Sequence, residues 1–410
     1  MMRKTLVLMV GLLLSASVWT FASTWTVGQS GADFRTIQAA VDAAESGDVI
    51  VVASGIYRES VRITTSRVEL VGAGAGQSII ENVDIPVSFV RLVGGRLEGF
   101  SLRYTGLQEK PALLIENASP LVVDNEITGA GLAGIEIHNG ATPTLFGNHI
   151  HENVGTGVLV YDGADANLTG NIIERNGLGQ VDHPGIEVRQ NGRATIDFNQ
   201  LLFNGGSGAF VHGGADAALL GNFIVGNGLH GIAIEDEATA DINSNSVWWN
   251  TEVGVLLRRN SVVSVTGNAI ARNLLGLVLF KEAARKAVSP TQSDNLFLFN
   301  IRDTLGIGLS PLDVRLVNDA FTHPQADELL QTLALIGESI ADLQTRFSEE
   351  GQNRFIALLQ NAELIQANIY NQSGLLDKAE TRYRMVIRLD LNSSAADQAR
   401  AALDALGRQS

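Results

Sequence analysis

Cysteine is absent from the 410-residue sequence, and proline is scarce at 8 residues. Without cysteine the chain has no disulfides, no thiolate metal sites and no cysteine nucleophile. Basic residues are also few, 29 against 44 acidic ones, and the formal charge of −15 would repel the phosphates of a nucleic acid. Charged residues make up only 18% of the chain and hydrophobic residues 45%, a balance that excludes wholesale disorder.

The first 22 residues have the layout of a secretory signal peptide. Arg3 and Lys4 supply a positive start, residues 5–18 are an apolar run, and Ala22 precedes Ser23 at a small-residue cleavage site. The run is short for a membrane span, so we expect no span once the signal has been cleaved near Ala22. The predicted location is periplasmic or secreted.

Glycine is plentiful at 43 residues, and together with asparagine it marks a repeat of 23 residues. A second asparagine follows the first after five residues, and a glycine opens an apolar stretch in each unit. The first asparagine ladder consists of Asn125, Asn148, Asn171, Asn199, Asn222, Asn245, Asn268 and Asn295. Such regularity indicates a structural repeat. We expect the asparagines at its corners, since Asn tolerates a left-handed backbone and can hydrogen-bond to neighbouring coils.

Within each unit the apolar residues alternate with polar ones, as Ile135 and Ile137 do around Glu136, and this is the periodicity of a strand. One unit cannot bury its own apolar face, but stacked units form a continuous core. The sequence therefore predicts a mainly β fold, a parallel β-helix solenoid over 23–310 with three short strands per 23-residue coil. A helix over 33–46 is expected to cap the open edge of the first coil.

Beyond a linker at 311–325, the apolar period becomes helical, which predicts a small all-α domain over 326–410. An apolar seam runs from Leu329 to Phe347 in steps of three and four residues. The seam is interpreted either as core packing or as a surface for self-association. Residues 360–393 resemble a single tetratricopeptide repeat. Because about three repeats form a stable array, we expect either a module that docks a protein partner or a buttress packed on the rod.

The stretch WTVGQSGADFRTIQAAVDAAESGDVIVVASGIYRESVRI at 25–63, followed by VELVGAG and repeating GNxI coils, resembles the right-handed parallel β-helix, or pectin lyase-like, superfamily. The sequence is most similar to its carbohydrate-binding and sugar-hydrolase repeat proteins and to periplasmic accessory proteins of copper-enzyme maturation. The resemblance covers about residues 25–310 and implies a right-handed coil. It implies no single activity, because the same rod carries lyases, esterases, epimerases and non-catalytic binders.

Alternation places a column of polar and aromatic residues on the outer face of the strands that follow the repeat glycines. These candidate ligand-binding residues are His138, Tyr161, Arg189, His212, Glu235 and Arg258, together with Glu187 in the adjacent column. Coils stack about 4.8 Å apart, a spacing that suits an extended polymer laid along the rod. Tyr161 can stack on a sugar face, and Arg189 can pair with an acidic sugar group. The alternative is an ordinary mixed surface with cross-strand pairs.

One coil is 28 residues long, and insertions into a repeat often form binding faces. His183 in this insertion is a candidate general base that Asp182 would orient. The competing interpretation is a surface-loop histidine without a catalytic role. No cofactor is indicated. No metal is expected either, because His149 and His151 share an outer face but lack a third ligand.

Three functions remain open on the sequence. The first is an exported protein that binds an extended polysaccharide along the rod while its helical tail docks a partner, and basic groups in the site would favour an anionic polymer. The second is a polysaccharide-modifying enzyme, namely a lyase, an epimerase or a glycoside hydrolase. The third is a periplasmic accessory protein for metal-enzyme or envelope assembly. The lack of a recognisable acid/base cluster favours the binding protein.

Overall fold

The computed structural model describes residues 22–178, 183–279, 292–293, 295–298, 300, 302–306, 326–345, 348–372 and 374–407. The signal-peptide run, Asp182, the 311–325 linker and Phe347 lie outside the described residues.

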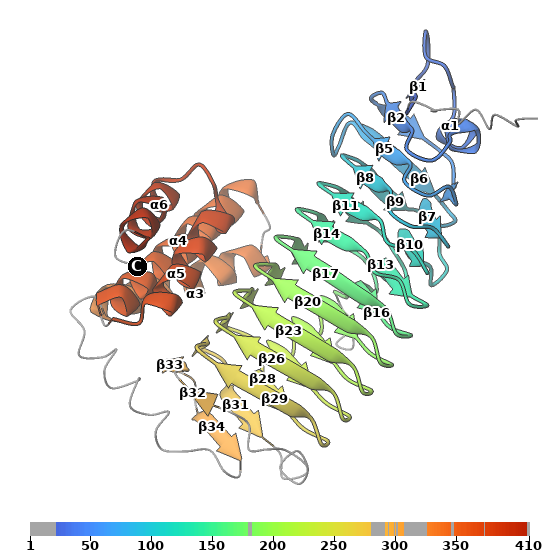
Figure 1. Ribbon diagram of the computed structural model, residues 1–410. Coiled ribbons are helices and arrows are strands. Elements are labelled where there is room, and N and C mark those ends of the chain that lie inside the picture. The colour runs from blue at the N-terminus through green and yellow to red at the C-terminus, as the bar shows by residue number, and fades with distance from the viewer. Residues whose placement is uncertain are drawn as a thin grey trace, which may run out of the picture.

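Three parallel sheets of 12, 11 and 11 strands form the body of the molecule, a solenoid of about 11 turns (Figure 1). Sheet A consists of β1 (Thr24–Val27), β2 (Val49–Val52), β5 (Glu69–Val71), β8 (Arg96–Glu98), β11 (Leu121–Val123), β14 (Thr144–Phe146), β17 (Asp165–Thr169), β20 (Arg193–Asp197), β23 (Asp216–Leu220), β26 (Thr239–Asn243), β29 (Val262–Thr266) and β32 (Gln292–Ser293). Sheet B consists of β3 (Gly55–Tyr57), β6 (Ser78–Asn82), β9 (Ser101–Tyr104), β12 (Glu126–Thr128), β15 (His149–His151), β18 (Ile172–Glu174), β21 (Gln200–Leu202), β24 (Phe223–Val225), β27 (Ser246–Trp248), β30 (Ala269–Ala271) and β33 (Leu296–Leu298). Sheet C consists of β4 (Val61–Ile63), β7 (Val87–Val90), β10 (Leu113–Glu116), β13 (Ala133–His138), β16 (Thr156–Val160), β19 (Ile186–Val188), β22 (Ala209–Val211), β25 (Ile232–Ile234), β28 (Val253–Leu257), β31 (Leu275–Leu279) and β34 (Arg302–Gly306).

Each strand pairs in register with the strand one coil away, so the repeat of the sequence becomes the stacking direction of the rod. Ile135 of β13 lies beside Val158 of β16, which in turn lies beside Ile186 of β19. All three side chains are fully buried in one continuous apolar core. The parallel β-helix predicted from the alternation is confirmed.

The asparagines of both ladders are buried, except the half-buried Asn300 at the end of the second, and their amides hydrogen-bond from coil to coil. Asn222 Nδ2 donates to Asn245 Oδ1 at 2.9 Å and to the carbonyl of Ile196 at 2.7 Å. Its Oδ1 accepts from the backbone N–H of Asn199 at 2.9 Å. The left-handed backbone expected at these asparagines instead occupies the residue before them, such as Phe198 with φ +55°. The asparagine is therefore selected for its amide, which satisfies the corner backbone that would otherwise lie buried without partners.

The helix expected over 33–46 is shorter in the structure, where α1 spans Ile37–Ala43. It begins late because the Thr36 hydroxyl caps the N–H of Ala39 at 3.4 Å. The Glu59 carboxylate accepts from the N–H groups of Ile37 and Gln38, both at 2.9 Å. The helix packs against β1, β2 and β4 at the beginning of the rod (Figure 1).

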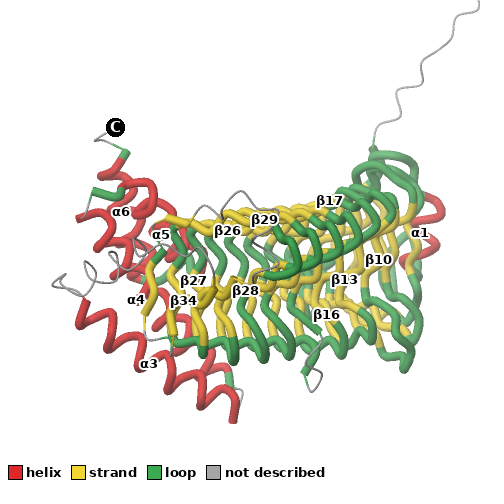
Figure 2. Tube along the Cα trace, turned by 90° about the horizontal axis from the view of Figure 1, so that it is seen from below, coloured by secondary structure: helices red, strands yellow, loops and turns green. Residues whose placement is uncertain are grey.

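Within the described residues, the C-terminal all-α region consists of α3 (Ala326–Thr345), α4 (Glu349–Gln372), α5 (Leu376–Leu389) and α6 (Ser394–Leu406). They lie beside the last coils of the rod rather than apart from it (Figures 1 and 2). None of the helices described is long and apolar enough to cross a membrane.

The apolar seam of α3 packs on the outer face of sheet B. Its residues Leu329, Leu333, Ile336, Ile340 and Leu343 are buried in one cluster with residues of β24, β27 and β30. The seam therefore serves as core packing between the helices and the rod, which is the first of the two interpretations of the seam. The described residues of the seam are thus used within this chain, and self-association through 326–410 stays a prediction.

Candidate functional site

The predicted column lies on the outer face of sheet C, where its side chains form a contiguous row. Tyr161, which follows β16, stacks on His138 of β13 with ring centroids 5.2 Å apart and planes 22° apart. The Arg189 guanidinium, which follows β19, lies 5.5 Å from the centroid of the Tyr161 ring. The row is thus an aromatic face bounded by an imidazole and a cation.

Tyr161 is held in place by Glu136, a residue of β13 on the same outer face. The phenol donates a hydrogen bond to Glu136 Oε1 at 2.7 Å. Burial raises the pKa of Tyr161, and the hydrogen bond to Glu136 raises it further. Tyr161 therefore stays a neutral phenol with a fixed ring orientation at physiological pH.

Glu187 of β19 connects the two halves of the row. One of its carboxylate oxygens, Oε1, lies 3.2 Å from Arg189 Nη1 and 3.1 Å from His212 Nε2. Burial tends to raise the pKa of Glu187, but the His212 hydrogen bond and the nearby charges of Arg189, His212 and His183 outweigh it and hold the pKa below its usual value. A charged carboxylate hydrogen-bonded to an imidazole can position that imidazole or act with it in proton transfer.

His212 stacks on Phe210 of β22, with ring centroids 4.2 Å apart and planes 16° apart. Phe210 in turn lines a depression of about 340 Å³ next to the row. We call this depression the Phe210 pocket; its lining residues are Pro184, Ser207, Phe210, Leu229, His230, Ala233, Glu235 and Arg258. Glu235 is 2% exposed and forms an ion pair with Arg258. Its second oxygen lies 3.6 Å from Arg259 Nη1. All seven candidate ligand-binding residues of the column therefore lie along one face of the rod.

His183 lies at the edge of this site, four residues before Glu187 in the sequence. Its carbonyl accepts a hydrogen bond from Gly206 at 2.9 Å, and its charge is among those that lower the pKa of Glu187. Gly177 packs so closely on His183 that a β-carbon there would lie 2.5 Å from the histidine Cβ. His183 therefore helps to shape the corner of the long coil. A catalytic role shared with Asp182, which lies outside the described residues, stays a prediction.

Several residues of the site were not among the candidates, including Glu136, Phe210 and His230. Glu136 and Phe210 occupy the column two residues after the repeat glycines, so the same periodicity could have selected them. His230 precedes the glycine of its coil in a turn, where alternation predicts no orientation.

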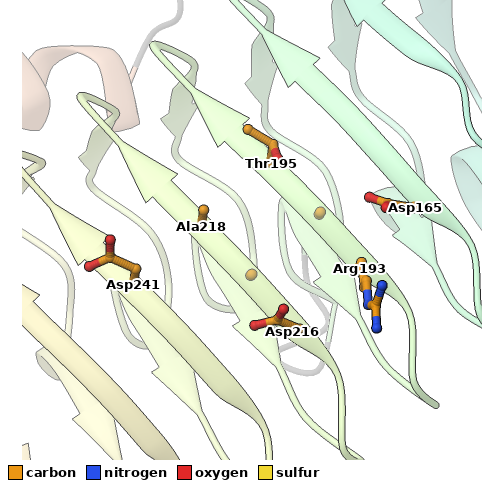
Figure 3. A pocket seen from close by; sticks show the side chains of 8 residues that line it. Asp165, Arg193, Thr195, Asp216, Ala218 and Asp241 are labelled. Atoms are coloured by element: carbon orange, nitrogen blue, oxygen red, sulfur yellow. The ribbon is translucent and has the colours of Figure 1, made fainter.

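The other two faces of the rod carry polar groups of a different kind. On sheet A a depression of about 370 Å³ is lined by short side chains and acidic groups, among them Asp165, Asp216 and Asp241, with Arg193 between Asp165 and Asp216 (Figure 3). These side chains lie spread over separate strands in Figure 3. Within the described part of the chain, no three His, Asp or Glu residues are grouped so as to hold a metal ion.

On sheet B, His149 and His151 stack with ring centroids 4.0 Å apart. Each ring is engaged by a carboxylate of a neighbouring coil. His149 Nε2 lies 3.0 Å from Glu174, and His151 Nε2 lies 3.4 Å from Glu126. The hydrogen bond with His151 lowers the pKa of Glu126 to about 2, against burial that raises it. These contacts form a ladder of histidine–carboxylate pairs along sheet B.

Comparison with known proteins supports the right-handed coil. The family model described as a right handed beta helix region matches residues 105–183 and 179–300. With the three parallel sheets, this match makes the rod a right-handed parallel β-helix. No match was found among curated protein sequences.

Similar solved structures include the A-module of a mannuronan C-5 epimerase from Azotobacter vinelandii, at 17% identity and a TM-score of 0.46, covering 65% of this chain and 92% of that one. A pectate lyase matches at 12% identity and a TM-score of 0.48, covering 70% of this chain and 79% of its own. A protein in complex with xylose matches at 10% identity and a TM-score of 0.44, covering 61% and 69%.

Proposed function

We propose that this protein is an exported β-helix protein that binds an extended polysaccharide across the outer face of sheet C. The observation that carries the proposal is the unbroken row from Glu136 through Tyr161, Arg189 and Glu187 to His212. A sugar ring has an apolar face that stacks on an aromatic ring, and hydroxyls that hydrogen-bond to charged groups. The row offers both kinds of contact on successive coils, about 4.8 Å apart.

The row is organised before any ligand arrives. The Glu187 carboxylate fixes Arg189 and His212, and the Glu136 carboxylate fixes Tyr161. Side chains that are already oriented lose little conformational entropy on binding, which favours affinity. Arg189 is still one third exposed, so its guanidinium can contact a hydroxyl or an acidic group of the polymer.

The sharpest test compares matched arginines on two faces of the rod. We would screen the protein against neutral and anionic polysaccharides on a glycan array and measure the affinity of any hit by calorimetry. Arg189→Ala should weaken binding by about 1.5–3 kcal/mol, and Tyr161→Ala should weaken it as well. Arg193→Ala on sheet A serves as the control and should bind like the wild type. Failure of every polymer to bind, or wild-type affinity in both site variants, contradicts the proposal.

A polysaccharide-modifying enzyme is the second candidate, and the hydrogen-bonded Glu187–His212 pair is the observation that favours it. An imidazole held by a carboxylate can move a proton to or from a bound sugar. Lyase, epimerase and glycoside hydrolase activities would each leave a distinct product, which mass spectrometry and NMR can identify. His212→Ala should then abolish turnover while leaving most of the binding. Bound polymer recovered unchanged after long incubation rules the enzyme out.

Docking of a protein partner by the helical region belongs to the same proposal. Because the described part of the α3 seam is buried against the rod, a partner would have to use the outward surfaces of α4 to α6. Pull-down of a partner that is lost on substituting exposed residues of α6, such as Arg400→Glu, would support this role. Arg193→Glu, at an exposed arginine on sheet A of the rod, is the matched control.

A further inference from the structure

The Phe210 pocket is lined by both apolar and polar residues. The apolar ones are Phe210, Leu229, Ala233 and Pro184, and His230 is among the polar ones. A cavity of about 340 Å³ is near the lower end of the range for small-molecule sites, so it has room for one sugar residue and a substituent.

Among the described residues that line the pocket, the charged side chains are paired. Glu235 is buried and ion-paired with Arg258 and Arg259. Burial lowers the pKa of His230, and although Glu252 raises it, the net shift is downward, so the imidazole is neutral at physiological pH. The charges of Glu235 and Arg258 cancel and His230 adds none, so the lining residues offer an anionic ligand group no net attraction. The pocket therefore suits a neutral group.

His230 also supplies hydrogen-bonding capacity that the protein leaves unused. Its Nδ1 is buried, 3.6 Å from the nearest carboxylate oxygen of Glu252, so a ligand in the pocket would reach the other ring nitrogen, Nε2. A neutral imidazole has one N–H donor and one acceptor nitrogen. No hydrogen bond from a described residue engages Nε2, so a ligand that pairs with it gains affinity.

We propose that the Phe210 pocket binds the acetyl substituent of a neutral, acetylated sugar residue. The methyl group would pack on Phe210 and Leu229, and the acetyl carbonyl would accept the hydrogen bond of His230. The inference rests on the proposed function, because the stacked pair Phe210–His212 connects the pocket to the row that would hold the polymer.

The test uses probes that differ in the acetyl group alone. Chitohexaose and cellohexaose share a neutral β-1,4-linked backbone and differ in their acetamido groups, and acetylated xylan can be compared with the same xylan after alkaline deacetylation. The full-length mature protein should bind the acetylated member of a pair about tenfold more tightly, as expected for one buried methyl group and one hydrogen bond.

Two variants locate the preference in the pocket. Leu229→Trp fills the pocket from its half-exposed rim, and His230→Phe keeps a flat ring while removing both nitrogens. Both should lose the preference for the acetylated probe and retain the affinity for the unacetylated one. Val93→Trp, at a residue that is 66% exposed and outside the pocket, should behave like the wild type. Circular dichroism of each variant verifies its fold.

The outcomes separate the two proposals. Equal or weaker binding of the acetylated probes, with unacetylated polymers still bound through Tyr161 and Arg189, overturns the acetyl pocket and leaves the proposed function standing. An acetyl preference that survives Leu229→Trp and His230→Phe also overturns it. If no polymer of either kind binds, the proposed function fails and the acetyl pocket fails with it.

Discussion

Arg382 of α5 and Glu363 of α4 form an ion pair that is closed off from solvent, with side chains 1% and 0% exposed. Arg382 Nη1 lies 3.0 Å from Glu363 Oε2. Both side chains also hydrogen-bond to Ser246 of β27, and Arg382 Nη2 donates to the carbonyls of Asn245 and Gly267 at 3.3 and 3.2 Å. The pair therefore joins two helices to two consecutive coils of the rod.

Breaking this pair should loosen the helical region from the rod. Arg382→Met leaves the Glu363 carboxylate buried without a counter-charge, and we expect a loss of about 3–5 kcal/mol in the free energy of unfolding. Urea denaturation followed by circular dichroism measures the loss. The exposed pair Glu380–Arg384 on α5 is the control, and Arg384→Ala should cost less than about 1 kcal/mol. If the two variants lost equal amounts of free energy of unfolding, the buried Arg382–Glu363 pair would not be the contact that stabilises the helical region on the rod.

Removing the helices should make the rod self-associate. A chain that ends at residue 325 exposes the outer face of sheet B, including Phe223, Val225 and Trp248, all of which are at most 1% exposed in the intact protein. A large contiguous apolar patch on a soluble protein favours association. Light scattering should show a single species for the full chain and larger particles for the truncated one. A monodisperse truncated rod with a cooperative melt would show that the helices are a dispensable module.

The buried asparagine ladder should be sensitive to single substitutions. Asn222→Ala removes the oxygen that accepts from the backbone N–H of Asn199, together with the amide that donates to the Ile196 carbonyl and to Asn245. A buried polar group left unsatisfied, as the Asn199 N–H would be, costs about 1–3 kcal/mol, so the free energy of unfolding should fall by at least that amount. Asn191→Gly, at an exposed turn with φ +60°, is the control and should change stability little, because glycine adopts that backbone readily. Chemical denaturation of both variants provides the comparison.

The sequence predicted those parts of the molecule that the repeat specifies. A period of 23 residues places equivalent side chains one coil apart, so the alternation around Ile135 and the column from His138 to Arg258 follow directly from parallel register. For the same reason, the contact of Tyr161 with both His138 and Arg189 could be anticipated.

Contacts between elements without a shared period could not be predicted in this way. Arg382 meets Ser246 across 136 residues of sequence. Arg388 of α5 reaches the rod at Phe146 and Phe198, with its guanidinium 5.9 Å from each ring centroid. No spacing rule links a helix to a particular coil, because the docking depends on three-dimensional shape. The position of His230 in the Phe210 pocket could not be predicted, because this residue lies in a turn and the alternation of strand residues does not extend into turns.

Acid should weaken the protein partly through Glu187. Its pKa in the folded protein lies below the ordinary glutamate value of 4.5, because the hydrogen bond from His212 and the charge of Arg189 overcome its burial. The ionised carboxylate therefore contributes stability above about pH 4.5, and this contribution is lost as the pH falls through the lowered pKa. Glu187→Gln should reduce the free energy of unfolding at pH 7 by about 1.5–3 kcal/mol, the range for a hydrogen bond to a charged group. The difference from the wild type should shrink at pH 3.

Glu152→Gln, at an exposed carboxylate paired with Arg175, is the control and should differ from the wild type by less than about 1 kcal/mol at both pH values. A deficit in Glu187→Gln that is the same at pH 7 and pH 3 would mean that the carboxylate is not held in its charged form by its neighbours.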